Sequence, residues 1–437
     1  MSPESNIDWD AVTDEAVDLL SEYIRVDTVN PPGNETRACD WFGRILDQEG
    51  IRYRLYDPGE NRATLVATLQ GDGSRGKPLI LLNHTDVVPF ERDHWTFEPL
   101  SGEVRDGYIW GRGAQDMKGM GIMELMTFVL HKRQGLPLHR DLTFIAVADE
   151  EAGSAYGVEF LDREHPEVLD CAYVINEGGT GATELFGVER PVFNIGVAEK
   201  GPLWLKLTTT GRPGHGSVPH DDNAAARLVR ALARIDQWER PLEPAAEVLE
   251  YFRQLHEAGI IEQEPTTELL SEFAAENPRV KSVQMNSIAL TTFKAGMKHN
   301  VIPAQAEATI DCRLIPGYDP ERFLTELREV IDDPEVKIEE IFRSSTPPSP
   351  LDTELYAVMT RAAKDAVEEA VVVPGVSTGF TDSRVFRRRG VPAYGFVPIL
   401  VEPDDVGRVH GNDERISIEN MRLGTQILHA TVRGICG

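Results

Sequence analysis

Residues 79–86 read LILLNHTD, an unbroken apolar run that ends in a histidine and an aspartate. Two similar runs follow: residues 142–148 precede the acidic triplet 149–151, and residues 173–176 precede Glu177. Apolar runs without polar alternation, separated by helical stretches, are typical of parallel strands that are buried on both faces of a sheet. Ligands of such sheets gather beyond the carboxyl ends of the strands. The sequence therefore predicts an α/β fold with its site at the ends of these runs.

Seven acidic or imidazole side chains lie at these ends or in comparable loops: His84, Asp86, Asp116, Glu150, Glu151, Glu177 and His410. Alone, each has a simpler explanation, such as an N-cap for Asp116 or an acidic helix start for Glu150 and Glu151. Together they supply two imidazoles and several carboxylates, one of which can bridge. A pair of divalent ions such as zinc requires this set of ligands. The combination indicates a two-metal site.

Nine short motifs, in order along nearly the whole chain, carry a family resemblance. They are residues 84–89, 111–119, 149–151, 176–179, 214–217, 300–303, 311–313, 381–384 and 409–411. In these motifs the chain resembles the metallopeptidase and deacylase family of aminoacylase, acetylornithine deacetylase, succinyl-diaminopimelate desuccinylase and carboxypeptidase G. Residues 381–384 and 394–396 look most like its Gly-X carboxypeptidase and N-acyl amino acid hydrolase branch.

The resemblance implies a centre with two zinc ions per subunit. Asp116 would bridge the two ions. His84 and Glu177 would complete one site, and Glu151 and His410 would complete the other. Cobalt or manganese could substitute for zinc, because mixed imidazole and carboxylate ligands suit these ions as well. The resemblance also implies a cis peptide bond after Asp116.

Two neighbours of these ligands receive other roles from the resemblance. Glu150 would be the general base, which takes a proton from the attacking water and passes it to the leaving amine. Asp86 would hydrogen-bond the ring nitrogen of His84 that faces away from the metal, which fixes the tautomer. Only one member of the adjacent pair Glu150 and Glu151 needs to face the ions, so the two roles are compatible.

The resemblance places substrate-binding groups in the second half of the chain. Asn300 and Arg313 would help to hold the substrate, and a guanidinium grips a carboxylate in a planar, bidentate manner. Arg313 could instead form an ion pair on a strand face. His215 would enter the active site of a partner subunit and donate a hydrogen bond to the oxyanion. The substrate site would also include Gly379, Phe380 and Thr381.

Phe380 departs from the family pattern, which often has a second glycine at this place. Its side chain could line the substrate pocket or simply pack against neighbours. Glu177 is typical of deacylases and carboxypeptidases rather than of aminopeptidases that use Asp. The expected reaction is therefore hydrolysis of the amide bond of N-acyl amino acids or short peptides with a free carboxylate, by metal-activated water.

Other functions stay open at this point. A deacetylase or desuccinylase of an amino-acid biosynthetic intermediate, or a dipeptidase, would use the same site. A binding protein with a vestigial site is disfavoured because no ligand or base is missing from the motifs. A purely structural dimer module would leave the ligand-rich strand ends unexplained.

The texture of the sequence changes near residue 199. Before it, helices are expected at residues 13–24, 37–49 and 117–134. After it, strands are expected at residues 203–210, 282–293, 304–314 and 336–341, and helices at 223–235 and 321–331. Apart from an insertion at 238–278, the order is then β-α-β-β-α-β, which is that of a ferredoxin-like sandwich. A linker rich in Ser, Thr and Pro at 344–350 would return the chain to the first domain.

The predicted architecture has two parts. A discontinuous dimetal catalytic domain, residues 1–198 and 343–437, would have the zinc-peptidase-like α/β fold with a mostly parallel central sheet. An inserted α+β domain, residues 199–342, would be the lid and, by the resemblance, the contact surface of a homodimer.

Composition excludes several partners. The chain of 437 residues carries a net charge of -28, which argues against nucleic acid and anionic membranes because both are negative. The four cysteines are far apart, so buried free thiols are expected rather than disulfides. Residues 1–10 lack the features of a secretory signal, and no apolar run could span a bilayer. The expected location is therefore the cytoplasm.

Overall fold

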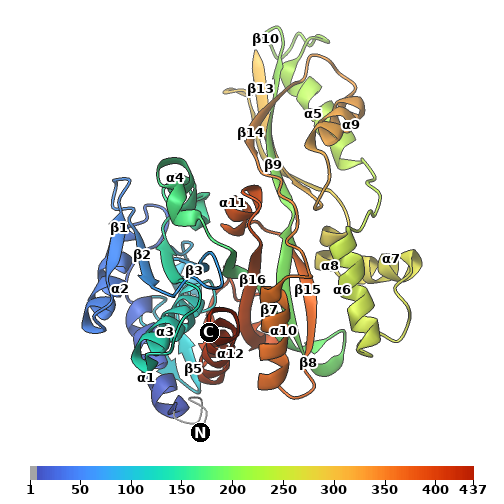
Figure 1. Ribbon diagram of the computed structural model, residues 1–437. Helices are drawn as coiled ribbons and strands as arrows, with labels where there is room; N and C mark the ends of the chain where they lie inside the picture. The colour runs from blue at the N-terminus through green and yellow to red at the C-terminus, as the bar shows by residue number, and fades with distance from the viewer. Residues whose placement is uncertain (1–6) are drawn as a thin grey trace.

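The chain folds around an eight-stranded sheet in the order β1-β2-β6-β3-β7-β16-β8-β15, seen in a computed structural model that describes residues 7–437 (Figure 1). These strands are Tyr53–Tyr56, Thr64–Leu69, Leu142–Val147, Leu79–His84, Tyr173–Leu185, Ala393–Val401, Val188–Glu199 and Val371–Ser377. The central strands β6, β3, β7 and β16 pair in parallel. The predicted fold class, with a mostly parallel central sheet, is confirmed.

Both faces of this sheet are buried, as the unbroken apolar runs predict. Leu79 and Leu81 of β3 point into one core, whereas Ile80 and Leu82 point into another. The first core is closed mainly by helices α1 (Trp9–Ile24), α2 (Thr36–Gln48), α3 (Lys118–Gln134), α10 (Glu354–Ala366) and α12 (Ile418–Cys436). The second is closed by α4 (Val158–Glu164) and α11 (Ser383–Arg388).

A second sheet has the order β11-β13-β9-β14 and is antiparallel throughout. Its strands are Ser287–Ala295, Gln305–Leu314, Gly201–Thr210 and Lys337–Arg343, and helices α5 (Ala224–Asp236) and α9 (Pro320–Ile331) pack on it. Along the chain the order is β9-α5-β11-β13-α9-β14, the expected β-α-β-β-α-β. The short strands β10 (Gly214–His215) and β12 (Val301–Ile302) pair at the end of this sheet that is far from β3 (Figure 1).

Three helices between α5 and β11 pack beside the large sheet and not on the second one. They are α6 (Ala246–Glu257), α7 (Thr267–Glu276) and α8 (Pro278–Val283). Phe252 and Leu255 of α6 share a core with Val371 and Val373 of β15. Asn277 caps α8, and this helix occupies the chain as far as Val283. The strand expected at residues 282–293 therefore starts only at Ser287. The division into domains 1–198 with 343–437 and 199–342 stays a prediction.

The remaining elements are short. Strands β4 (Glu103–Arg105), β5 (Tyr108–Trp110) and β17 (Arg415–Ser417) form a small sheet, and single 3-10 turns occur at Arg92–His94, Glu150–Ala152, Pro166–Leu169 and Pro403–Asp405. Residues 344–350 form no regular element.

Other expectations about the chain meet the structure in part. The four cysteines are buried and free, as expected. Among the described residues no helix has the length and apolarity needed to cross a membrane. The first six residues of the stretch 1–10, in which no secretory signal is seen, lie outside the described part.

Candidate metal centre

The large sheet brings most of the candidate ligands to one edge. His84 is the last residue of β3, Glu151 lies just beyond the end of β6, and Glu177 lies within β7. These three strands are neighbours in the order β6-β3-β7. Asp116 precedes α3 and His410 lies in the loop before β17, so five separate segments converge on the site.

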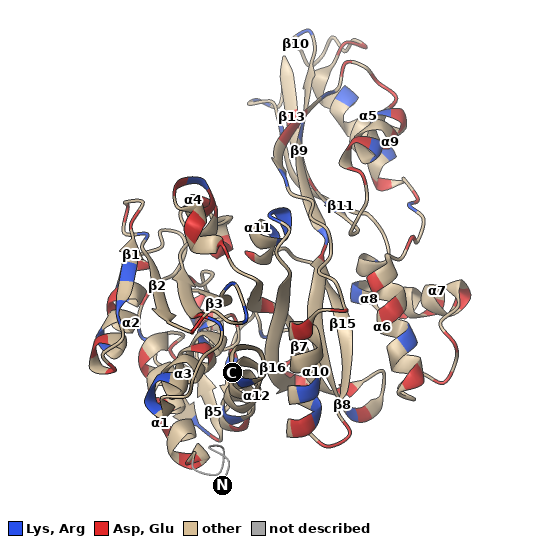
Figure 2. Ribbon diagram, in the orientation of Figure 1, with Lys and Arg blue, Asp and Glu red and all other residues tan. Residues whose placement is uncertain are grey.

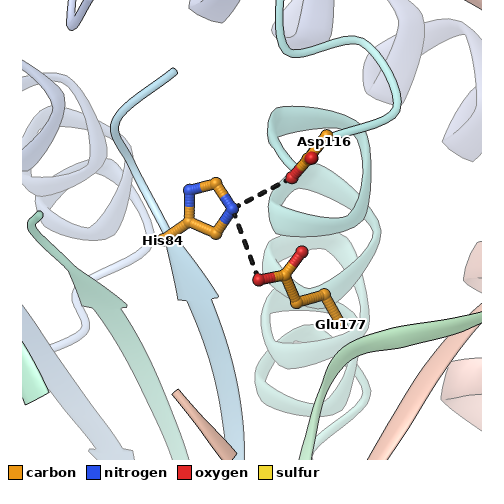
Figure 3. Close-up of side chains that lie close together, drawn as sticks. All are labelled: His84, Asp116 and Glu177. Carbon is orange, nitrogen blue, oxygen red and sulfur yellow. Dashed lines mark hydrogen bonds and ion pairs between the residues drawn. The ribbon is translucent and has the colours of Figure 1, made fainter. Parts of the chain in front are cut away.

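The five side chains form two triads that share Asp116. In the first, His84 Nε2 lies 3.1 Å from Asp116 Oδ1 and 3.6 Å from Glu177 Oε1 (Figure 3). In the second, His410 Nε2 lies 3.0 Å from Asp116 Oδ2 and 3.4 Å from Glu151 Oε1. Each triad has ligand atoms within 4.8 Å of one another. Asp116 thus presents one oxygen to each triad, which is the arrangement that a bridging carboxylate needs.

The donor set fits divalent cations. His84 Nδ1 donates to the main-chain oxygen of Asp86 at 3.0 Å, so in the neutral ring Nε2 keeps its lone pair toward the triad. Glu151 Oε1 is buried and accepts no hydrogen bond from the described residues. An imidazole and two carboxylates in each triad, one carboxylate being shared, match the nitrogen and oxygen ligands of zinc. The peptide bond after Asp116 is cis, as expected.

The charges at the site also favour a cation. Burial, together with the neighbouring Asp116 and Glu151, raises the pKa of Glu177 to about 8, although His84 opposes the shift. The neighbouring carboxylates of Asp116 and Glu151 raise the pKa of His410 to about 10. Carboxylates that crowd in this way repel one another unless a positive charge lies between them.

Glu150 belongs to neither triad although it adjoins Glu151. Its side chain is buried, with 9% of the residue exposed. Burial, reinforced by the charge of Glu177, raises the pKa of Glu150 well above its usual value. Glu150 and Glu151 therefore lie in different environments, Glu150 outside the triads and Glu151 within one. A general base next to a metal ligand requires such a difference.

Asp86 hydrogen-bonds His84 as expected, but through its main chain. Its side chain lies 3.6 Å from His84 Nδ1, and its main-chain oxygen receives the hydrogen bond instead. The carboxylate accepts from the main-chain N–H groups of Glu150 and Glu151, both at 3.1 Å, and from Asn30 Nδ2 at 2.8 Å. Because three donors already hold the carboxylate, the carbonyl oxygen is left to fix the imidazole.

Glu414 is a buried residue of the site that sequence reasoning missed. Its carboxylate accepts from the main-chain N–H groups of Gly113 at 3.0 Å, Gln115 at 2.7 Å and Asp116 at 3.1 Å. Arg112 Nη1 completes the set at 2.7 Å. Glu414 thereby ties the loop that carries Asp116 to the segment that follows His410. The only signal in the sequence is its position shortly after His410.

His215 and Asn300 lie together but away from the triads. His215 is in β10 and exposed, and the main-chain oxygen of Asn300 accepts a hydrogen bond from Gly216 N at 2.8 Å. His215 Nδ1 accepts from Ser217 N at 3.2 Å, so the neutral ring carries its proton on Nε2. Figure 1 places β10 at the far end of the second sheet. The described chain therefore does not bring this histidine to its own metal centre.

The other substrate candidates meet where the two sheets join. Arg313 Cζ lies 5.2 Å from the ring centroid of Phe380 and 5.9 Å from that of Trp204. Phe380 also packs with Trp204 and Phe342, at centroid distances of 6.1 and 5.7 Å.

The loop around Phe380 is anchored at both sides. Thr381 Oγ1 donates to Glu199 Oε1 at 2.6 Å. Gly379 N donates to Ser377 Oγ at 3.1 Å, and Gly379 is exposed. Arg313 itself forms the strand-face ion pair considered above, with Asp311 Oδ1 at 2.8 Å and Oδ2 at 3.1 Å. Its Nη1 has no hydrogen-bond partner among residues 7–437 and can still meet a ligand.

The fold and the two triads define a class, the metal-dependent hydrolases. The model of the peptidase family M20/M25/M40 matches residues 80–434, and the chain belongs to this family.

Similar proteins carry related activities in their names. The chain is 32% identical to an N-fatty-acyl-amino acid synthase/hydrolase of Xenopus tropicalis, over 94% of this chain and 84% of that protein. It is 27% identical to human aminoacylase-1, over 92% and 90% of the two chains. An M20 family metallo-carboxypeptidase from Sulfolobus solfataricus superposes with a TM-score of 0.71 at 18% identity, over 97% of this chain and 99% of that one. The last likeness concerns the fold alone.

Proposed function

We propose that the protein hydrolyses the amide bond of N-acyl amino acids, or of short peptides that bear a free carboxylate, at a dizinc centre. The observation that carries this proposal is the pair of triads that share Asp116, with the buried Glu150 beside them. His84 and Glu177 would hold one zinc ion, and Glu151 and His410 the other. Two bound ions would polarise the carbonyl group and acidify a water molecule.

Glu150 performs the proton transfers. It accepts a proton from water as the water oxygen bonds to the carbonyl carbon. As the C–N bond breaks, Glu150 passes that proton to the leaving nitrogen, so that a carboxylic acid and an amine are released. The hydrogen bond from Glu150 N to Asp86 Oδ1 holds the main chain from which this side chain extends.

Arg313 and Phe380 are suited to the two ends of the substrate. The free Nη1 of Arg313 would bind the carboxylate of the amino acid, since charge-assisted hydrogen bonds to carboxylates are strong. The rings of Phe380, Trp204 and Phe342 offer an apolar wall for the acyl group. The names of the aminoacylase and fatty-acyl-amino acid hydrolase relatives support acylated amino acids as substrates. A deacetylase, desuccinylase or dipeptidase activity is the alternative within the same chemistry.

The second sheet offers a surface for a homodimer. β11 is one of its two edge strands, and Leu290 and Phe293 on it are 46% and 47% exposed. An exposed apolar edge strand pairs readily with another chain. We propose that a second copy covers this surface and that each subunit lends His215 to its partner's metal centre. The Nε2–H group of His215 would donate to the oxyanion that forms during attack. A cytoplasmic location stays a prediction.

Subunit mixing tests the role of His215. Glu150→Ala and His215→Ala variants should each be inactive alone. After verified subunit exchange, random pairing leaves half of the dimers mixed, and each mixed dimer has one intact site, so about a quarter of wild-type activity should return. Activity that stays at the parental level would show that His215 acts within its own subunit or is not needed.

A substrate screen tests the proposed reaction. Zinc-loaded and cobalt-loaded protein should cleave N-acyl amino acids with apolar acyl groups faster than dipeptides with a free amino terminus. The Arg313 guanidinium beside Phe380 would repel the charged ammonium group of such a peptide, whereas a neutral acyl chain meets no such repulsion. Faster cleavage of the free-amino peptides would move the assignment to an aminopeptidase or dipeptidase.

A further inference from the structure

Behind the metal centre, one carboxylate fixes both members of the acidic pair. Asp86 is fully buried, and it accepts the main-chain N–H groups of Glu150 and Glu151. Any shift of the Asp86 carboxylate would therefore move the general base and a metal ligand together. Asn30 is the only side chain among the described residues that donates a hydrogen bond within 3.5 Å to this carboxylate.

Asn30 stands between two carboxylates. Its Nδ2 donates to Asp86 Oδ2 at 2.8 Å and to Asp149 Oδ1 at 3.1 Å, and the residue is only 4% exposed. Its Oδ1 accepts from Arg62 Nη2 at 3.2 Å. The two N–H groups of one amide thus separate two buried negative charges, and the arginine fixes which way the amide points. Asp149 directly precedes Glu150, so this bond also holds the turn from its other side.

Arg62 supplies the positive charge for this cluster. Its Nη1 donates to Asp149 Oδ1 at 2.9 Å and to Glu35 Oε1 at 2.7 Å, and both carboxylates are buried. The loop is shaped around the guanidinium, because a Cβ on Gly33 would lie 2.4 Å from Arg62 Cζ. Gly33 has a φ of +95°, which other residues rarely adopt. A buried cation in this position offsets charges that would otherwise repel one another.

We propose that Asn30 and Arg62 are positioning residues that act through Asp86 and Asp149 to hold Glu150 and Glu151 in register with the metal centre. Neither side chain belongs to a metal triad. Asn30 is linked to the acidic pair through Asp86 and Asp149. Arg62 is linked to it through Asp149 and through Glu35, whose Oε1 also accepts from Asp149 N at 3.2 Å. The role assigned to Glu150 rests on the proposed function. The placement of Glu151 as a ligand gives a second readout that needs no substrate.

Asn30→Ala and Asn30→Asp test the proposal together. Asn30→Ala removes the donor, and Asn30→Asp keeps the size while it adds a third carboxylate between Asp86 and Asp149. Asn420→Leu is the matched control, because the Asn420 amide also makes two hydrogen bonds, with the main chain of Leu400, on the segment that leads away from the triads. If Asn30→Ala does not fold, Asn30→Ser takes its place under the same criteria.

The expected result is a loss in kcat at constant KM. For Asn30→Ala, kcat should fall about 10- to 100-fold, the range seen when residues that orient metal ligands are removed. Asn30→Asp should fall further, whereas Asn420→Leu should keep the wild-type kcat. A kcat within twofold of wild type in Asn30→Ala, or a similar loss in the Asn420→Leu control, would overturn the proposal.

Zinc affinity, measured by competition with a chelator, separates this proposal from the proposed function. If the wild-type protein binds zinc but cleaves no substrate in the screen, the proposed function fails while the positioning role can still be read. Asn30→Ala should then bind the more weakly held zinc ion about 10- to 100-fold less tightly than wild type. Unchanged zinc affinity in both Asn30 variants would in that case overturn the positioning role.

Discussion

Glu150→Gln should lower the turnover of an N-acyl amino acid by about 10² to 10⁴-fold while the protein keeps its metal. The amide has the shape of the carboxylate but cannot accept the proton of water. Glu150 lies outside both triads, so its loss leaves all the proposed ligands in place. Steady-state kinetics combined with elemental analysis of the same preparation measures both quantities.

Glu151→Gln is the matched control for this prediction. The two residues are adjacent and share Asp86 as the acceptor of their main-chain N–H groups. Glu151 Oε1, however, faces His410 and belongs to the second triad. Its substitution should lower the metal content. If Glu150→Gln lost metal and Glu151→Gln kept it, the assignment of the pair would be reversed.

Amidation of the substrate carboxylate should cost about 2 to 5 kcal/mol in the transition state, a fall of roughly 30- to 5000-fold in kcat/KM. The methyl amide of an N-acyl amino acid would leave the free Nη1 of Arg313 without its partner. Asp311 already binds Nε and Nη2 of Arg313, so only Nη1 is left to bind the substrate carboxylate. The comparison needs only two substrates that share the same acyl group.

Arg313→Met supplies the control for this second prediction. It should slow the hydrolysis of the free acid and leave the slow hydrolysis of the methyl amide nearly unchanged, because the amide gains nothing from the guanidinium. Equal rates for the two substrates with the wild-type protein would show that the carboxylate is not recognised at this position.

The ends of β3 and β6, and the candidate ligands that follow them, were predictable from sequence because each rests on a local pattern. An unbroken apolar run leads into His84, and a second leads into Glu150 and Glu151. A third leads into Glu177, but the strand end expected there was wrong, because β7 continues to Leu185. Parallel pairing then brings the ends together without further information. The chain order β-α-β-β-α-β of the second sheet and its helices was predictable for the same reason, since polar–apolar alternation marks the strands and helical periodicity marks the helices.

The residues that support the ligands could not be predicted. Glu414 and Asn30 lie in irregular segments with no periodicity, and their partners come from distant parts of the chain. The packing of α6 on β15 could not be predicted either, because the sequence of an amphipathic helix does not show which surface the helix covers. Asp86 was predicted to hydrogen-bond the ring nitrogen of His84 that faces away from the metal, and only the geometry reveals that its main-chain oxygen accepts this bond.

Metal content tests the central claim most directly. Elemental analysis of purified protein should find about two divalent ions per subunit, zinc being favoured by the ligands. His410→Ala should retain about one ion, since the triad of His84, Asp116 and Glu177 stays complete. Asp116→Ala should retain almost none, because both triads lose a ligand. A folded protein that remains fully active after chelation has removed every metal ion would contradict the account.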